Sequence, residues 1–389
     1  MPKVHVAVLG AGGTIAPAIV RDLAASPEVA GMLLLDLDQA RAQRVAGEHG
    51  GVGMRARRAD ARDSGALAEQ LRGVDVDVLV NAASYRTNLD AMRACLAAGC
   101  NYLDLGGLYW MTTRQLQLGA EFERAGLLAL LGIGSSPGKT NLMALRAARE
   151  LGDELPIETI EVAAAGRDPQ ARDDGRLHPP YALGTLMDEL TLAPVVIRDG
   201  QPVQIEALRA GGELDFGEPI GRAQTVYTLH SELATFAQSF GCRRASFRLS
   251  LAPDVLAALA QLVGAPAQAL ARVALEAVAP SSETVSVHLV RAVAQDGASV
   301  SVRAVTRPHL GLGGSIVSTA APAAAAVRLL ARGALIATGA HPPERCIEPS
   351  VMFAELAQRG CSFTAAASEA SAAERLSLRA FPPATGCAR

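Results

Sequence analysis

The chain has 389 residues, more than one hydrophobic core usually supports, so its length predicts two domains of about 100 to 200 residues each. A net charge of -3 with 19% charged residues argues against a nucleic-acid-binding surface and against a disordered acidic protein. Six scattered cysteines without a C-x-x-C pair favour reduced thiols over disulfides or a zinc site. We therefore expect a small-molecule partner, with no nucleic acid and no metal.

The two ends of the chain and its most apolar stretch predict where the protein resides. The start enters an apolar segment without the charged and small-residue regions of a signal peptide, which predicts a cytoplasmic protein. Residues 320–340 are interrupted by Pro322, Arg328 and Gly333, so we expect a buried helix there and no membrane span. Residues 379–389 are expected to form a flexible tail.

The first predicted element is a strand over residues 3–9 that runs into a glycine turn and then a helix. Such a unit binds the pyrophosphate of a dinucleotide, because backbone N–H groups at a helix N-terminus face the phosphates and glycines let them approach. Ile15 stands where the third glycine of the usual motif is expected, although the spacing Gly10, Gly13, Ala16 also fits. The alternative is a glycine turn in a nucleotide-free α/β protein. The predicted contacts are Gly10, Gly12, Gly13, Thr14 and Ile15.

A carboxylate follows the second predicted strand at the place expected for a ribose contact. Asp36 ends the apolar run 32–35, about 20 residues past the turn, where it can bind the adenosine hydroxyls. Its charge repels the 2′-phosphate of NADP, so NAD is the expected cofactor, while Arg41 and Arg44 keep NADP possible. Asp60, after the third predicted strand at 54–58, is a further predicted cofactor contact.

Helical and strand-like segments alternate up to residue 133, which predicts a parallel sheet of six strands. Because ligands bind at the carboxyl ends of such strands, we expect Asn81, Ala82 and Ala83 beside the dinucleotide. The further predicted strands are 75–83, 101–104 and 127–133, and the predicted helices are 39–48, 65–71, 88–98 and 114–125.

Three residues near these strand ends are candidate substrate contacts. Tyr85 and Arg86 follow the fourth strand, and a guanidinium there can bind a substrate carboxylate in a bidentate manner. Asp104 ends the fifth strand and is either a site carboxylate or the former of a turn.

The turn-forming residues 134–141 are expected to end a Rossmann dinucleotide-binding domain at residue 140. The second domain, 141–319, is predicted to be α+β with a mixed sheet, and the aperiodic stretch 166–180 is predicted to be a lid loop. Asp296-Gly297 predicts a tight hairpin between the last two of its strands. The predicted strands are 157–164, 195–198, 224–227, 244–249, 285–294 and 300–306, and the predicted helices are 254–262, 266–278, 321–331 and 350–359.

Several segments together resemble the saccharopine dehydrogenase-like oxidoreductases, which include lysine 6-dehydrogenase. They are the glycine turn and residues 101–107, 134–141, 181–190, 228–235 and 339–344. The resemblance implies a Rossmann domain completed by C-terminal helices within 320–378, and a substrate domain whose sheet supports a homodimer. It also implies hydride transfer between a nicotinamide and a C–N bond of an amino acid or a derived amine. Lys139 departs from the family pattern, in which an aliphatic residue is expected.

Oxidising an amine requires a group that takes the N–H proton. His230 and Glu232 lie two residues apart after a predicted strand, so their side chains can share one side; the alternative is a satisfied polar cluster or a helix cap. Lys139 is a third catalytic candidate, able to protonate a carbinolamine, with an exposed loop lysine as the alternative. Tyr181 is a predicted substrate contact.

The sequence therefore predicts an NAD(P)-dependent oxidoreductase of amines that is a homodimer. Two alternatives remain at this stage. One is a catalytically silent NAD(P)-binding regulator, which the altered glycine pattern permits. The other is a carbonyl reductase, which the lack of a suitably placed Tyr-x-x-x-Lys pair disfavours.

Overall fold

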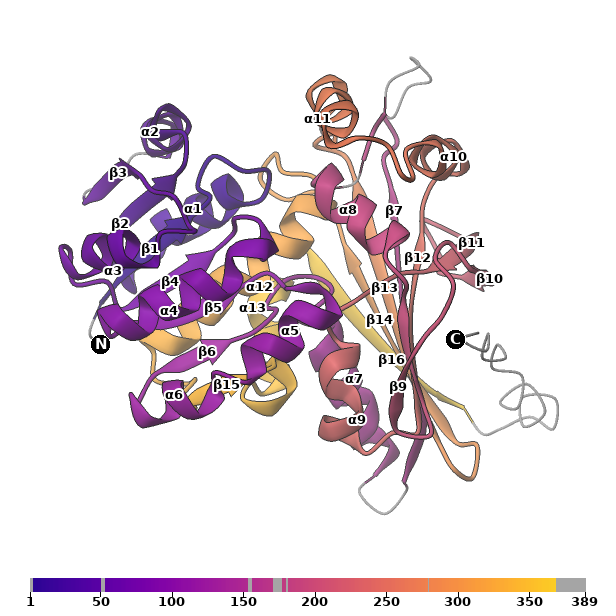
Figure 1. The fold of residues 1–389 in the computed structure, drawn as a ribbon. Helices are drawn as coiled ribbons and strands as arrows, with labels where there is room; N and C mark the ends of the chain where they lie inside the picture. Colours follow the sequence, from indigo (N-terminus) through magenta and orange to yellow (C-terminus); the bar gives the residue numbers. More distant parts are fainter. Residues whose placement is uncertain are drawn as a thin grey trace, which may run out of the picture. The chain divides into compact units, whose positions relative to one another are not determined.

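The computed structural model describes residues 3–49, 53–152, 156–170, 177–179, 181–278 and 280–368. The chain forms two compact units (Figure 1). Unit 1 comprises Met1–Asn141 and Ile316–Arg359, and unit 2 comprises Leu142–Ser315 and Gly360–Arg389. The fold is α/β, with a parallel sheet in unit 1 and a mixed sheet in unit 2, as the sequence predicts.

The sheet of unit 1 has seven parallel strands in the order β15-β6-β5-β4-β1-β2-β3. The seventh strand, β15, comes from the C-terminal part of the chain and pairs with β6, so the prediction of six strands was incomplete. The strands are β1 (Val4–Leu9), β2 (Val29–Asp36), β3 (Met54–Arg58), β4 (Val78–Asn81), β5 (Asn101–Asp104), β6 (Leu128–Leu130) and β15 (Gly339–His341).

The strands β1, β2 and β4 of unit 1 carry runs of buried apolar residues, as expected for a parallel sheet covered on both faces, whereas the edge strand β3 contains three arginines. Leu79 and Tyr102 pack in one cluster with apolar residues of α3 (Ser64–Arg72), α4 (Asn88–Ala98) and α6 (Gly119–Arg124). The predicted helix 114–125 is in fact two, α5 (Leu108–Leu116) and α6, because Gln117 and Leu118 make tight i→i−3 bonds that end the first. The other helices of unit 1 are α1 (Ala16–Ala24), α2 (Gln39–Glu48), α13 (Pro349–Ala357) and most of α12 (Gly314–Ala331).

The helix α12 is long and apolar enough to cross a membrane, but 78% of it is buried inside the protein. This burial agrees with the core helix expected from the sequence. A buried helix in the core of a globular protein can be as long and as apolar as a membrane-spanning helix.

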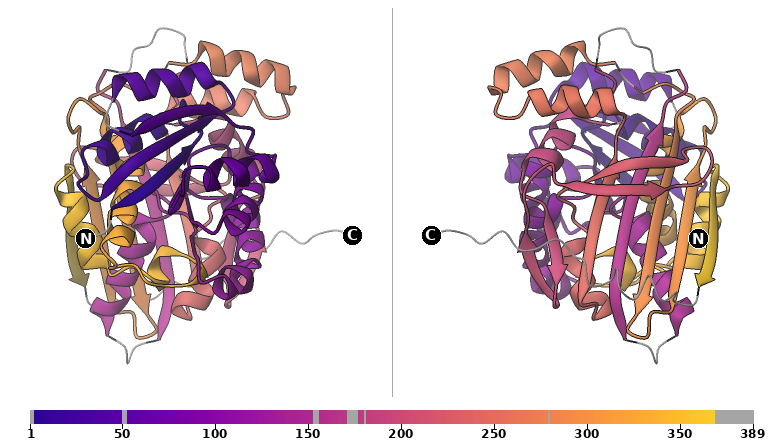
Figure 2. Two further views of the ribbon diagram at one scale, coloured as in Figure 1. Left: turned by 90° about the vertical axis from the view of Figure 1, so that its left-hand side faces the viewer. Right: turned by 90° about the vertical axis from the view of Figure 1, so that its right-hand side faces the viewer.

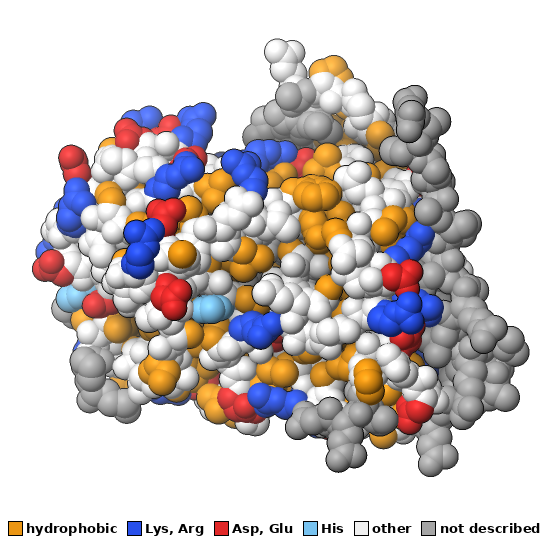
Figure 3. All heavy atoms as spheres, turned by 60° about the horizontal axis from the view of Figure 1, so that its bottom comes forward, with side chains coloured by type: hydrophobic (Ala, Val, Ile, Leu, Met, Phe, Trp, Pro, Cys, Tyr) orange, Lys and Arg blue, Asp and Glu red, His pale blue; other side chains and the backbone are white. Residues whose placement is uncertain are grey.

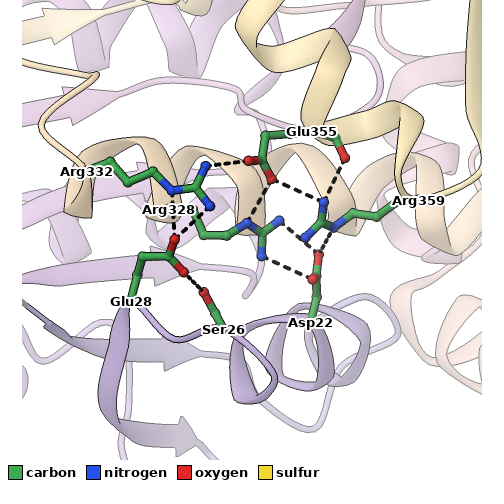
Figure 4. A network of polar contacts seen from close by, with 7 residues as sticks. All are labelled: Asp22, Ser26, Glu28, Arg328, Arg332, Glu355 and Arg359. Carbon is green, nitrogen blue, oxygen red and sulfur yellow. Dashed lines mark hydrogen bonds and ion pairs between the residues drawn. The ribbon is translucent and has the colours of Figure 1, made fainter. Parts of the chain in front are cut away.

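An ion-pair network fixes α12 and α13 to α1 within unit 1 (Figure 4). Arg328, only 3% exposed, lies 3.1 Å from both Asp22 of α1 and Glu355 of α13. Three arginines face three carboxylates, so the buried charges compensate each other. The remaining pairs are Arg359 with Asp22 (2.7 Å) and Glu355 (3.2 Å), and Arg332 with Glu28 (2.7 Å) and Glu355 (2.6 Å).

The sheet of unit 2 has nine strands along the path β10-β11-β12-β7-β13-β14-β16, with β8 and β9 attached beside β12. In the right-hand view of Figure 2 the strands β7, β13, β14 and β16 lie side by side. The hairpin between β13 and β14 turns at Gly297, whose φ is +92°. The strands are β7 (Ile157–Arg167), β8 (Val195–Arg198), β9 (Gln201–Gln204), β10 (Ala210–Asp215), β11 (Arg222–Tyr227), β12 (Arg244–Ser250), β13 (Val285–Ala294), β14 (Ser299–Thr306) and β16 (Cys361–Ser368).

The C-terminal segment that belongs to unit 1 is shorter than the sequence predicts, because the strand β16 belongs to unit 2. Residues 320–378 were expected to complete the first domain, but the return ends at Arg359, because β16 pairs with β14 over its full length in unit 2. The predicted tail 379–389 and residues 171–176 and 180 of the predicted lid loop lie outside the described residues, and the first two residues of that loop end β7.

The helices of unit 2 include two that carry candidate site residues or support them. The helix α9 (Leu233–Phe240) packs against β12 and β8, and α8 (Leu183–Thr191) buries Leu186 and Leu190. The others are α10 (Pro253–Gln261), α11 (Ala267–Glu276) and α7 (Lys139–Leu151), which begins in unit 1. Figure 3 shows basic and acidic side chains interspersed over one face of the molecule, in agreement with the small net charge.

Candidate functional site

The glycine turn of unit 1 leaves no room for side chains. Gly10 has φ +75°, and a Cβ there would lie 2.7 Å from the backbone of Ala83, which follows β4. At Gly12 a Cβ would lie 2.4 Å from Cβ of Arg41. Thr14 and Ile15 then lead into α1, whose N-cap makes no side-chain hydrogen bond. The turn thus presents bare backbone before a helix N-terminus, which fits the pyrophosphate of a dinucleotide.

Asp36 is held beside this turn by two backbone donors. Its Oδ2 accepts a hydrogen bond from the Gly12 N–H (2.8 Å) and its Oδ1 accepts one from the Asp38 N–H (2.9 Å). Each oxygen keeps a second lone pair for a ribose hydroxyl. Arg41 lies nearby with its side chain 55% exposed, and its Nε is 3.8 Å from Asp38. The predicted contact Asp60 instead pairs with Arg62, whose hydrogen bonds lower the pKa of Asp60 to about 2.

Asn81 at the end of β4 shapes the loop expected beside the dinucleotide. Its buried Oδ1 accepts from the Ala83 N–H (3.1 Å), and its Nδ2 donates to Asn88 (2.9 Å) and to the Tyr102 hydroxyl (3.2 Å). The side chain is therefore engaged within unit 1, and the backbone of Ala82 and Ala83 faces the glycine turn.

Asp104 is the centre of a buried polar network at the end of β5. Burial raises the pKa of this carboxyl, which is 1% exposed. Its geometry is that of the turn-forming alternative, since the N–H of Gly106 two residues on donates to Oδ1. A carboxylate has about four lone-pair sites, so five donors leave none for a substrate. The five donors are the N–H groups of Gly106 and Gly132, the hydroxyl of Tyr102, and the amides of Asn88 and Gln115.

Tyr85 and Arg86 lie together in a short 3₁₀ turn (Tyr85–Thr87) after β4. The Arg86 guanidinium lies 5.0 Å from the centroid of the Tyr85 ring, a distance typical of a cation–π contact. Arg86 is exposed and Tyr85 is half-buried, so both remain candidate substrate contacts.

Lys139 begins α7 and has no exposed surface, which makes the alternative of an exposed loop lysine wrong. Its Nζ donates to the hydroxyl of Ser318 on α12 at 2.6 Å. Two residues later, Asn141 donates to the buried Glu344 at 2.8 Å. These bonds tie the start of α7 to the C-terminal segment of unit 1.

Unit 2 carries a cluster of four polar residues, three of them buried, which we call the His230 cluster: Tyr181, Glu189, His230 and Glu232. His230 Nδ1 lies 2.9 Å from Glu232 Oε2, and His230 Nε2 lies 3.7 Å from Glu189 Oε2. The Tyr181 hydroxyl donates to the same Glu189 oxygen. The imidazole also stacks on Phe247 of β12, with ring centroids 3.5 Å apart and planes 19° from parallel. His230, Glu189 and Glu232 are at most 5% exposed.

Local structure brings these side chains together. The backbone N–H of Leu229 donates to the carbonyl of Glu189 (3.0 Å), which fixes α8 against the segment that carries His230. The N-cap of α9 is Glu232, whose side chain makes no capping hydrogen bond, so the helix-cap alternative does not apply to it. The carboxylate of Glu232 is thereby left to bind His230.

The electrostatics of the cluster favour a protonated imidazole. Burial alone would lower the pKa of His230, but the carboxylates of Glu232 and Glu189 outweigh it and raise that pKa to about 10. Burial and the neighbouring Glu189 raise the pKa of Tyr181 as well. The imidazole of His230 therefore holds a proton at neutral pH.

Glu189 belongs to the segment 181–190 and is a residue of this site that was not among the predicted site residues. It lies three residues after Leu186 and one before Leu190, and both leucines are buried. This helical spacing places Glu189 on the buried face of α8, where a carboxylate needs a partner. The spacing of the apolar residues along α8 is the sequence feature from which the burial of Glu189 could have been predicted.

Together the two units define a dinucleotide-binding α/β protein with a second, mixed-sheet domain. Residues 6–130 match the saccharopine dehydrogenase NADP binding domain family. The whole fold is similar to that of saccharopine dehydrogenase (L-Glu forming) from Saccharomyces cerevisiae, with a TM-score of 0.68 at 14% identity over 94% of this chain and 100% of that one. Residues 6–130 are thus an NAD(P)-binding domain of the saccharopine dehydrogenase type, and the chain as a whole shares the fold of saccharopine dehydrogenase.

Two curated relatives match shorter segments. Carboxyaminopropylagmatine dehydrogenase of Synechocystis sp. is 28% identical over 172 residues, which are 43% of each chain. Carboxynorspermidine synthase of Vibrio alginolyticus is 30% identical over 133 residues, 32% of this chain and 31% of that one. The chain thus matches less than half the length of these relatives.

Proposed function

We propose that this protein is an NAD(P)-dependent oxidoreductase that transfers hydride between the nicotinamide and a C–N bond of an amino-acid-derived amine. The match of residues 6–130 to an NADP binding domain supports the coenzyme. The two curated relatives are named for compounds that are amines, which supports the substrate class.

The observation that carries the proposal is the position of His230 between two carboxylates, 2.9 Å from Glu232 and 3.7 Å from Glu189, which raise the pKa of its imidazole. An imidazole held protonated in this way can exchange a proton with an amine nitrogen. Reducing an imine consumes one hydride and one proton, and the imidazolium of His230 is the stored proton. Oxidising the amine returns that proton to the cluster.

The residues of unit 1 have the separate task of binding the coenzyme, which supplies or accepts the hydride at its nicotinamide. The turn at Gly10, Gly12 and Gly13 binds the pyrophosphate, and Asp36 binds the adenosine ribose. The preference for NAD over NADP rests on the charge of Asp36 and stays a prediction.

An absorbance assay at the reduced-nicotinamide band tests this function. Purified protein is screened with NAD or NADP against amino acids and polyamine derivatives, and with the reduced coenzymes against 2-oxo acids plus amines. We expect turnover with at least one amine, and His230→Gln should lower kcat by about 10²-fold or more, the usual contribution of a general acid or base.

Calorimetric titration of the same samples with both coenzymes supplies the control. His230→Gln should bind coenzyme as the wild type does, and His309→Gln, a histidine outside the cluster, should keep full activity. Coenzyme binding without turnover on any amine would instead support the regulatory alternative.

A further inference from the structure

The imidazole of His230 is enclosed on every polar side. Its Nδ1 is 2.9 Å from Glu232, its Nε2 is 3.7 Å from Glu189, and one ring face lies on Phe247. The residue is 5% exposed. Both nitrogens thus face carboxylates of the protein itself, and neither is directed at a substrate atom. A second group must carry the proton between His230 and the substrate.

Glu189 connects His230 to such a group. Its Oε2 is the atom nearest to His230 Nε2 and is also the acceptor of the Tyr181 hydroxyl. The separation of 3.7 Å exceeds a hydrogen bond by roughly 0.8 Å, a difference typical of catalytic contacts before a ligand binds. One carboxylate oxygen therefore lies between an imidazolium and a phenol.

Tyr181 is the most accessible member of the His230 cluster. The residue as a whole is half-buried, with its hydroxyl on Glu189, whereas Glu189, His230 and Glu232 are buried. We propose that the hydroxyl of Tyr181, and not the imidazole of His230, is the group that exchanges the proton with the substrate nitrogen, and that Glu189 relays this proton. This inference rests on the proposed function, because it assigns the terminal group of the same site.

The relay balances without any change of electrons in the protein. During imine reduction the O–H proton of Tyr181 bonds to the substrate nitrogen, while the reduced nicotinamide supplies the hydride to carbon. Glu189 takes a proton from Nε2 of His230 and passes it to the Tyr181 phenolate, which restores the phenol. The step ends with a neutral imidazole, an ionised Glu189 and an intact phenol, and oxidation of the amine runs through the same steps in reverse.

The substitution Tyr181→Phe removes only the terminal hydroxyl. With the amine identified in the screen, we expect kcat to fall by about 10²-fold while substrate and coenzyme affinities change by less than threefold. The matched control Tyr227→Phe removes a half-buried hydroxyl from β11, outside the cluster, and should keep wild-type kcat. A kcat within twofold of wild type in Tyr181→Phe would overturn the inference and leave the proposed function intact.

A second measurement is independent of the substrate. In protein labelled with ¹⁵N-histidine, the ring N–H groups of His230 exchange with water through the relay, so Tyr181→Phe should slow this exchange at least tenfold, and Tyr227→Phe should not. Glu189→Gln, which removes the carboxylate between them, should slow it as much. Unchanged exchange in both variants overturns the relay, whereas slowed exchange in a protein that turns over no amine supports the relay and rejects only the proposed function.

Discussion

Single residues in this protein have their proton affinity set by their neighbours. The groups that face His230 are Glu232, Glu189 and the ring of Phe247, with Tyr181 behind Glu189. Two carboxylates outweigh the burial of the ring, and the imidazole stays charged at neutral pH. A histidine with an ordinary pKa near 6.5 would be mostly uncharged at neutral pH.

This shift predicts the pH dependence of the reaction. Imine reduction needs His230 in its protonated form. Its kcat should therefore stay level from about pH 7 to 9 and fall as the pH rises through about 10, the pKa of His230. Amine oxidation needs His230 in its neutral form, so its kcat should rise as the pH rises through about 10. Initial rates at saturating substrates measure both profiles.

The control for these profiles is Glu232→Gln. Losing the nearest carboxylate lowers the pKa of His230. The pH at which kcat changes should therefore be lower in both directions of the reaction. A wild-type break near pH 6.5 would contradict the assignment.

Part of the site could be predicted from single residues. His230 and Glu232 are two positions apart after a strand, and the structure places their side chains within 2.9 Å of each other. Glu189 is 41 positions from His230, and only the packing of α8 against the segment 228–232 brings them together. For Asp104, the sequence could not show that five donors surround one carboxylate, since those donors come from four separate segments.

At the scale of elements, the unit from β1 to α1 is the part that follows most directly from the sequence. Its apolar strand, its glycines and the acid at the end of β2 all depend on local backbone requirements. The strands β9 and β10 were missed because they lack a regular alternation of apolar and polar residues, and β16 because its short alternation over 361–364 runs on into small residues. Gln201–Gln204 is polar and largely exposed, β10 contains two glycines, and β16 consists mostly of small residues.

The glycine turn predicts a destabilising substitution. Gly10→Ala places a Cβ 2.7 Å from the backbone of Ala83 in a residue with φ +75°, so the free energy of unfolding should fall by about 1–3 kcal/mol and coenzyme binding should be lost. Urea denaturation and calorimetric titration with NAD and NADP measure the two effects.

Gly47→Ala is the matched control for this substitution. Gly47 lies inside α2, and a Cβ added there would meet no atom within 4 Å, so alanine should stabilise the protein by about 0.5–1 kcal/mol. Equal stability and coenzyme affinity in the two variants would show that the turn tolerates side chains.

At the scale of the whole chain, the ion-pair network of Figure 4 joins residues more than 300 positions apart. No local pattern encodes such pairs, which explains why they escaped prediction. Burial would raise the pKa of Glu28, but hydrogen bonds from Ser26 and Arg332 outweigh it and lower that pKa to about 2. The stabilisation from this carboxylate is present above its unfolded pKa of about 4.5 and is lost as the pH falls through about 2.

Removing the partner of Glu28 should therefore change the acid sensitivity of folding. We expect Arg332→Met to lower the free energy of unfolding at pH 7 by about 1–3 kcal/mol, and this deficit should shrink as the pH falls from 4.5 towards 2. Urea denaturation at a series of pH values measures it.

The comparison for this series is Arg272→Met, which breaks the exposed pair with Glu276 and should cost at most about 1 kcal/mol. A deficit in Arg332→Met that stays constant with pH would show that Glu28 is not its source.

The strand β15 has a consequence for how the protein is made. It forms the edge of the unit 1 sheet next to β6, yet it is translated about 200 residues after β6. Until residue 341 leaves the ribosome, every nascent chain carries a half-finished nucleotide fold whose β6 backbone is open to pairing with other chains. During the synthesis of unit 2 the open edge of β6 is therefore the part of unit 1 where non-native strand pairing is expected.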